Sequence, residues 1–379
     1  MSDDIRRLTQ CNNQKDTPNL NKSMLNRFPR KVCKLFLLLS AAITIGVCPI
    51  FGAPQKPYTI GVSNSYVNVW RSQMLDSLQK LGKEFQDDGT IKPLIIESGT
   101  VDIQGQIAQI RNLVARKVDA LIVFPVSATA LNSALEEASR AGILVIAALS
   151  PVNDPKILNI SIDQAEWARI SARWLNKTLD GHGDVVVMNG LAGHPDNEAR
   201  FNAVKEIFSS SPDIHLIPVN GDWDGVKAQQ VMSNVLAGRP KIDGVWVSGD
   251  MSAGVVKAIV AANPDKFPAV TGDGNLAYLR LWKDVKGNHP EFKSIAHIDP
   301  PSLAATASLR CAIYLLEGRQ LKDGVKKGKS GNAIYLPVPD PVGEDELPNK
   351  LEEFKDAPDT RFLDKPASKE LVESFFKAQ

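Results

Sequence analysis

The sequence is poor in cysteine. It contains four cysteines in 379 residues, and Cys11, Cys33 and Cys48 all precede residue 50. Cys311 is therefore alone in the body of the chain, so neither a disulfide framework nor a Cys-x-x-Cys metal site can be built there. Because Cys311 stands in an apolar run, we interpret it as a small buried residue on a helix.

An excess of charge of either sign is also absent. Lys and Arg number 44 against 43 Asp and Glu, which leaves a formal net charge of +1. No strong electrostatic field then attracts the chain to nucleic acid or to an anionic membrane. We therefore expect no nucleic-acid partner.

The sequence also lacks the short motifs of common catalytic sites. It has no P-loop, no Gly-x-Ser-x-Gly elbow and no His-Glu-x-x-His, and its five histidines are scattered. We expect no catalytic residues, no metal site and no cofactor, and hence a protein that is not an enzyme. One enzymatic alternative stays open, in which Asp163 and Asp273 act as paired carboxylates in glycoside hydrolysis.

The N-terminal region carries the pattern of an export signal. Basic residues at positions 27–34 precede an uncharged, apolar stretch from Leu35 to Ala53 that ends in small residues. This order is typical of a cleaved secretory signal peptide, here residues 1–53, and it predicts a periplasmic protein. A start at Met24 would shorten the unusually long basic region. The alternative is a retained membrane anchor, although Pro49 and Gly52 shorten the apolar run.

The body of the chain alternates short β-rich runs with segments of helical length. Apolar residues recur with helical spacing from Ile103 to Val114, and the runs 120–124 and 143–147 are apolar throughout. Strands that are apolar on both faces belong to parallel sheets covered by helices on both sides. The pattern predicts an α/β fold with a doubly wound parallel sheet.

The alternation breaks near residues 159–163 and then starts again, which predicts two lobes joined by a multi-strand hinge. We assign residues 57–162 plus about 297–322 to the N-terminal lobe. We assign residues 163–296 plus about 330–340 to the C-terminal lobe, with Asp163 at the hinge. Residues 341–379 form a C-terminal extension with a short helix at 369–377.

Five stretches between residues 57 and 338 carry a resemblance to one family. They are Ile60–Ser65 followed by Trp70 and Arg71, Val118–Pro125, Asn189–Gly193 with Asn197 and Arg200, Gly221–Trp223, and Thr271–Gly274. In this order they resemble the periplasmic sugar-binding proteins of ABC importers, of the ribose-binding type with its galactofuranose-binding relatives. The resemblance implies the periplasmic binding protein type I fold.

It also implies a monomer that captures a small sugar or polyol between its lobes and delivers it to the membrane subunits of an ABC permease. A second possibility is a sugar sensor that presents its ligand to a chemoreceptor or a histidine kinase. A transcription regulator of the lactose-repressor type shares the two-lobe core, but it needs a helix-turn-helix where this chain carries its export signal.

A sugar offers apolar ring faces and a rim of hydroxyls, so its site needs flat aromatic rings and strong hydrogen-bonding groups. Trp70 and Trp223 are the candidate rings, and the family places arginines at the positions of Arg71 and Arg200. The alternatives are core packing for the tryptophans and surface ion pairs for the arginines.

Asp273 and the stretch Ser63–Ser65 stand at strand ends, where open α/β sheets bind their ligands. Asp250 stands at a helix start, and His297 stands where the family often places a glutamine at an interlobe crossing. The remaining predicted ligand-binding residues are Ser63, Asn64, Ser65, Ser150, Asp250, Asp273 and His297. Turn formation, helix capping and ordinary structural roles are their alternatives. Ribose and galactofuranose binders carry an Asp-Arg pair where this chain has Leu149 and Ser150, so the resemblance does not identify the sugar.

Overall fold

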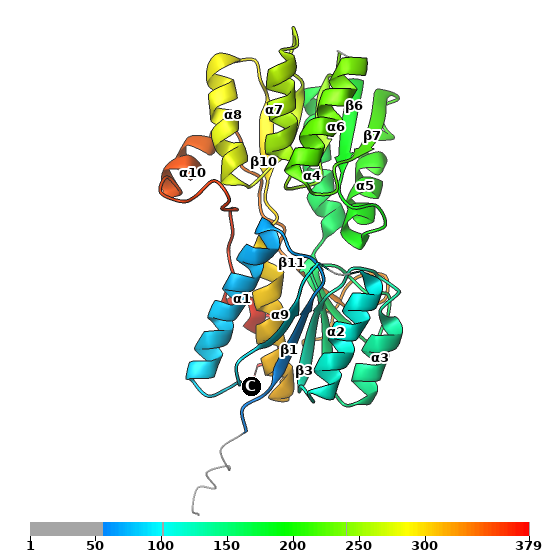
Figure 1. The fold of residues 1–379 in the computed structure, drawn as a ribbon, viewed down its shortest axis with the longest axis vertical. Helices are drawn as coiled ribbons and strands as arrows, with labels where there is room; N and C mark the ends of the chain where they lie inside the picture. The colour runs from blue at the N-terminus through cyan, green and yellow to red at the C-terminus, as the bar shows by residue number, and fades with distance from the viewer. Residues whose placement is uncertain (1–55, 101, 240, 379) are drawn as a thin grey trace, which may run out of the picture. The chain divides into compact units, whose positions relative to one another are not determined.

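The computed structural model describes residues 56–100, 102–239 and 241–378. The predicted signal peptide and its possible later start lie outside the described residues. No helix in the described ranges is both long and apolar enough to cross a membrane. Two parallel sheets organise the rest of the chain (Figure 1).

The first lobe is built on a six-stranded sheet with the order β11-β5-β4-β3-β1-β2, in which every pairing is parallel. Its strands are β1 (Ile60–Asn64), β2 (Ile95–Ser98), β3 (Ala120–Phe124), β4 (Leu144–Ala148), β5 (Leu158–Ile162) and β11 (Ala333–Leu336). One face is covered by α1 (Val69–Asp87) and α9 (Pro301–Leu316), and the other by α2 (Ile103–Ala115) and α3 (Asn132–Arg140) (Figure 1).

The second lobe has a five-stranded parallel sheet with the order β10-β9-β8-β6-β7. Its strands are β6 (His182–Asn189), β7 (Asp213–Asn220), β8 (Gly244–Val247), β9 (Ala269–Asp273) and β10 (Ser294–His297). One face is covered by α4 (Gln164–Thr178) and α5 (Pro195–Phe208), and the other by α6 (Gly225–Gly238), α7 (Ser252–Ala262) and α8 (Leu276–Asn288). The predicted doubly wound α/β architecture is confirmed.

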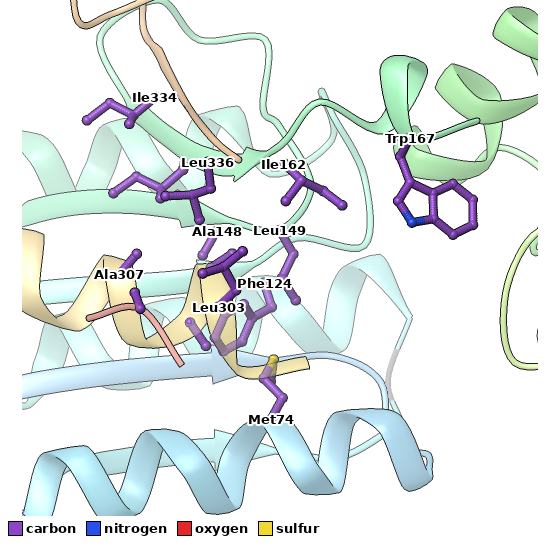
Figure 2. Packing of buried hydrophobic residues seen from close by; sticks show 14 of the residues in the cluster. Met74, Phe124, Ala148, Leu149, Ile162, Trp167, Leu303, Ala307, Ile334 and Leu336 are labelled. Carbon is purple, nitrogen blue, oxygen red and sulfur yellow. The ribbon is translucent and has the colours of Figure 1, made fainter. Parts of the chain in front are cut away.

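The core explains why the predicted strands are apolar throughout. Along β3, Ile122 and Phe124 pack with α1 and α9, whereas Leu121 and Val123 pack with α2 and α3. Figure 2 shows side chains from α1, β3, β4 and α9 pointing into one cluster, with Met74 beneath Phe124. Because successive strand residues point to opposite faces, a sheet covered on both sides needs apolar residues at every position.

One predicted lobe boundary is wrong. We assigned residues 330–340 to the C-terminal lobe, but β11 pairs with β5 in the sheet of the first lobe, where Ile334 lies opposite Ile160. A four-residue apolar strand can extend either sheet, and its local sequence does not specify its partner. The chain returns to the second lobe only after β11, where Val342 forms an antiparallel bridge with Ala296.

The connections between the lobes follow from this order. The chain passes from β5 to α4 at Asp163, which caps α4 by accepting a hydrogen bond from the Glu166 amide at 3.0 Å. It returns between β10 and α9, and it crosses again after β11. In the C-terminal extension, α10 (Leu347–Glu353) packs on α8, and α11 (Lys369–Glu373) packs on α9. The sequence pattern predicts a helix that overlaps α11 but none at α8 or α10.

Candidate functional site

A cavity of about 290 Å³ lies between the lobes, at the carboxyl ends of strands from both sheets. Such edges are where open parallel sheets bind their ligands. The lining residues come from both lobes, from the segment between β10 and α9 that crosses between the lobes, and from the C-terminal extension. They are Ser65, Tyr66, Asn68, Trp70, Arg71, Thr100, Val126, Leu149, Gln164, Leu191, His194, Asp196, Arg200, Trp223, Ser248, Gly249, Asp250, Asp273, Gly274, Asp299, Phe362 and Leu363.

The predicted ligand-binding residues divide into two groups. Those that line the cavity are Ser65, Trp70, Arg71, Arg200, Trp223, Asp250 and Asp273. Those that lie outside its lining are Ser63, Asn64, Ser150 and His297. The structure thus brings together both predicted rings and both predicted arginines, from opposite lobes.

Arg71 is the cation of the first lobe. Asn68 caps α1 by accepting a hydrogen bond from the Arg71 amide at 2.8 Å, and this places Arg71 in the first turn of the helix. Its Nη1 donates to Asn64 Oδ1 at 3.4 Å, and its guanidinium lies 5.6 Å from the Trp70 ring centroid. Burial lowers the pKa of Arg71 to about 10, so the side chain is still protonated at neutral pH.

Arg200 is the cation of the second lobe, and its guanidinium has three hydrogen-bond partners and one aromatic neighbour. It donates to Gln164 Oε1 at 2.8 Å and to the Ser248 carbonyl at 3.3 Å, and it pairs with Asp299 at 2.5 Å. Its guanidinium carbon stands 4.0 Å from the centroid of the Trp167 ring. Three of the five N–H donors of the guanidinium are used in this way, and two remain.

The local backbone sets the position of Trp223. Asp222 and Trp223 both have left-handed φ angles, 55° and 57°, which turn the chain sharply after β7. The indole Nε1 donates to the Ser248 carbonyl at 2.6 Å. The ring lies so close to Gly190 that a Cβ there would stand 2.1 Å from it, so only glycine fits at this position. On the opposite lobe, Trp70 Nε1 donates to the Asp299 carbonyl at 2.9 Å.

Two of the predicted carboxylates differ in their partners. Asp273 accepts from Ser252 Oγ at 2.7 Å and from the Asn275 amide at 3.0 Å, so it satisfies the local turn while it lines the cavity. Asp250 has a left-handed φ of 32° and accepts a weak 3.5 Å hydrogen bond from Asn68 of the opposite lobe. Burial, and then repulsion from Asp273 and Asp224, raises the pKa of Asp250 to about 8.

Asp196 and His194 line the cavity but were missed in the sequence analysis. Asp196 Oδ2 accepts from Ser150 Oγ of the first lobe at 2.7 Å, while its Oδ1 has no hydrogen-bond partner within the described residues. Burial raises the pKa of Asp196, although Arg200 and Arg71 oppose that shift. Burial, with help from the same arginines, lowers the pKa of His194 to about 3, so its imidazole is neutral. Both residues follow β6, so the strand-end rule could have found them.

Two of the predicted residues outside the lining support residues within it. Asn64 holds Arg71, and Ser150 holds Asp196. Ser63 Oγ donates to Gln109 Oε1 at 2.9 Å in the interior of the first lobe. His297 is buried, with its ring centroid 3.8 Å from that of Trp167.

In the described part of the chain, no group of three or more His, Cys, Asp or Glu side chains is arranged to hold a metal ion. What the cavity does offer is apolar ring surface, two guanidinium groups and several oxygen acceptors. Such a set suits a small neutral ligand that carries many hydroxyl groups.

Comparison with known proteins agrees with this architecture. Residues 60–320 match the periplasmic binding protein domain family, and the chain belongs to that family. A ribose import binding protein of Bacillus subtilis is 25% identical over 271 residues, which cover 71% of this chain and 85% of that protein. The resemblance drawn from the five sequence stretches is confirmed at the level of family and fold.

Solved structures lead to the same fold. An ABC transporter solute-binding protein from Thermobispora bispora superposes with a TM-score of 0.72 at 26% identity, covering 84% of this chain and 94% of that one. A solute-binding protein from Bacillus halodurans, solved with myo-inositol, has a TM-score of 0.67 at 20% identity and covers 79% of this chain and 100% of its own. All three of these proteins are named as binding proteins.

Proposed function

We propose that this protein binds one small sugar or polyol in the cavity between its lobes and delivers it, as a periplasmic monomer, to the membrane subunits of an ABC importer. One observation carries the proposal: Trp70 and Arg71 of the first lobe and Trp223 and Arg200 of the second line the same cavity. A ligand held by both pairs contacts both lobes at once.

The size of the cavity restricts the ligand. The cavity volume of about 290 Å³ is close to the lower limit for small-molecule pockets, which is about 300 Å³. A single sugar ring or a short polyol suits that space, whereas an oligosaccharide does not.

Donors and acceptors in the cavity match a rim of hydroxyl groups. Uncommitted N–H groups of Arg71 and Arg200 can donate to ligand oxygens, and the carboxyl of Asp250, whose contact with Asn68 is weak, can hydrogen-bond a ligand hydroxyl. Charged partners make these hydrogen bonds stronger than neutral ones. The indole faces of Trp70 and Trp223 then cover the C–H surfaces of the ring.

The relatives support a sugar or polyol as the ligand, but they do not identify which one. The named relative from Bacillus subtilis is a ribose import binding protein, and the neighbour from Bacillus halodurans holds myo-inositol. Leu149 is an apolar lining residue here, and Ser150 is committed to Asp196. Among the described residues, the loop after β4 places Leu149 and no charged side chain in the cavity lining, so we propose the class of ligand rather than one member.

Hydrogen bonds across the cavity suggest how ligand capture is signalled. Ser150 and Asp196 join the lobes at 2.7 Å, and Asn68 and Asp250 approach each other at 3.5 Å. Closure about the crossing segments near Asp163 and Asp299 would bring both lobe surfaces into one arrangement. A permease can recognise that arrangement and distinguish it from the open one.

Isothermal titration of the mature protein with D-ribose, D-xylose, D-allose, xylitol and myo-inositol tests the proposal. We expect saturable binding of at least one of them, and weaker binding of the same compound by Arg71→Met. Arg173→Met, which removes a surface partner of Glu166, is the matched control and should bind normally. A folded protein that binds no compound of the panel would overturn the proposal.

Genes for a permease and an ATPase beside this one, rather than a kinase gene, would support delivery to an importer.

A further inference from the structure

The C-terminal extension first fastens to the second lobe. After α10 it passes the guanidinium of Arg280, which donates to the carbonyl of Ala357 at 2.7 Å and forms an ion pair with Asp359. In Figure 1 this is the stretch that follows the label α10. Arg280 lies on α8, so the extension is anchored to this helix before it reaches the cavity.

Residues 359–364, which we call the tail strap, then run beside the loop between β9 and α8. The Leu276 amide donates to the Arg361 carbonyl at 2.9 Å, and the Leu363 amide donates to the Gly274 carbonyl at 2.7 Å. Asn275 and Phe362 form an antiparallel bridge between these two hydrogen bonds. The tail strap is thus paired with the same loop that carries Gly274 into the cavity lining.

The same residues are also held by the first lobe. The Gln73 side chain on α1 accepts from the Phe362 amide at 3.0 Å and donates to the Phe362 carbonyl at 3.1 Å. Asp364 accepts from the Ser302 amide at 3.0 Å and from Ser302 Oγ at 2.7 Å, at the start of α9. Phe362 is therefore hydrogen-bonded to the first lobe and bridged to the second at a single position.

The side chain of Phe362 completes the arrangement. It is 3% exposed, and together with Leu363 it lines the cavity that also contains Trp70 and Trp223. The backbone of Phe362 is fixed from both sides, so its ring has little freedom to leave the cavity wall. A buried aromatic ring held in this way acts as a rigid contact surface for a ligand.

We propose that the tail strap forms one wall of the ligand cavity and fastens the two lobes together there, so that Phe362 is a specificity-determining residue supplied by the C-terminal extension. The ligand part of this inference rests on the proposed function, whereas the fastening of the lobes does not.

Titration with the five-compound panel tests the wall. For the compound that wild type binds best, Phe362→Ala should weaken affinity by about tenfold or more, as expected for a buried aromatic contact. Phe362→Leu keeps apolar volume without the ring, so its loss should be intermediate. Phe354→Ala is the matched control, because Phe354 packs on the core of the second lobe outside the cavity lining and should change stability but not selectivity. If both Phe362 variants bind the panel compounds with wild-type affinity and preference, the proposal that Phe362 forms part of the cavity wall is wrong.

Small-angle X-ray scattering of the ligand-free protein tests the fastening and gives an answer even if no panel compound binds. The double variant Gln73→Leu, Asp364→Ala removes the hydrogen bonds to the first lobe without altering the cavity lining. Its radius of gyration should rise above that of wild type, because without these hydrogen bonds the lobes can separate further than the tail strap allows. Glu353→Ala, an exposed change on α10, should leave the radius unchanged. Equal radii for a folded double variant and wild type would contradict the fastening, whereas a silent panel alone would contradict the proposed function.

Discussion

The two sides of the cavity carry the same pair of residue types and hold them differently. On the first lobe, Arg71 makes one 3.4 Å hydrogen bond to Asn64 with its guanidinium and lies near the Trp70 ring. On the second lobe, Arg200 is fixed by Gln164, Ser248 and Asp299 and stacks on Trp167.

This difference suggests a division of work. A guanidinium with three committed donors is already oriented before any ligand arrives, so it loses little conformational entropy on binding. A loosely held guanidinium has more donors to offer, but it must be ordered by the ligand. We therefore expect Arg200 to contribute to both stability and binding, and Arg71 to contribute mainly to binding.

Removing the two arginines gives the largest expected contrast. Arg200→Met should lower the free energy of unfolding by about 2 to 4 kcal/mol, because Asp299 loses its ion pair and the buried Gln164 Oε1 loses its hydrogen-bond donor. Arg71→Met should cost clearly less. Urea unfolding of both variants measures this, with Arg169→Met as a control for an arginine in a more exposed ion pair with Glu206. If both variants lose the same free energy of unfolding, Arg200 contributes no more to stability than Arg71 does.

The two tryptophans extend the comparison to binding. Trp223→Ala should weaken the affinity for the best panel compound by about 30-fold, the effect of losing a well-packed aromatic contact. Trp70→Ala should also weaken it. Trp174→Ala is the control, since Trp174 lies on α4 outside the cavity lining. Titration that finds Trp223→Ala as tight as Trp174→Ala would show that the second-lobe ring does not contact the ligand.

The buried carboxylate of Asp250 makes the second lobe sensitive to alkali. Its pKa rises from 3.8 to about 8 on folding, so the folded state keeps a proton that the unfolded state has released. The resulting stabilisation is complete below pH 3.8 and is lost as the pH rises through about 8. The Tm of wild type should therefore fall as the pH rises from about 4 to about 8, by more than that of Asp250→Asn.

The exposed Asp265→Asn serves as the control for that experiment and should follow wild type across the pH range. If Asp250→Asn also follows wild type, Asp250 is ionised in the folded protein and does not cause the pH dependence.

The smallest expected effect concerns the contact between the lobes. Ser150→Ala should destabilise the protein by about 1 kcal/mol, because Asp196 Oδ2 loses a hydroxyl donor in a buried site. Ser233→Ala, which removes an exposed hydroxyl on α6, is the matched control. Thermal unfolding compares the two. A Ser150→Ala protein as stable as the control would mean that the hydrogen bond across the cavity adds nothing to the closed arrangement.

Sequence reasoning recovered most strands and helices and much of the site. Helical periodicity located α2, an unbroken apolar run located β3, and the strand-end rule placed Asp273 at the edge where the cavity lies. The same rule would have found Asp299, which comes two residues after β10. The lobe assignment drawn from the sequence was wrong for β11, which lies in the sheet of the first lobe. Ser63 and His297 were predicted to contact the ligand, but both are buried outside the cavity lining.

The sequence by itself determined the local structure and the kinds of side chain at the strand ends, because both depend on residues within a few positions of each other. Only the tertiary structure decided which residues share the cavity. Gln73 and Phe362 are 289 positions apart and Arg200 and Asp299 are 99 apart, yet each pair is hydrogen-bonded. Such contacts depend on how the two lobes and the tail strap pack together, and no local pattern in the chain encodes them.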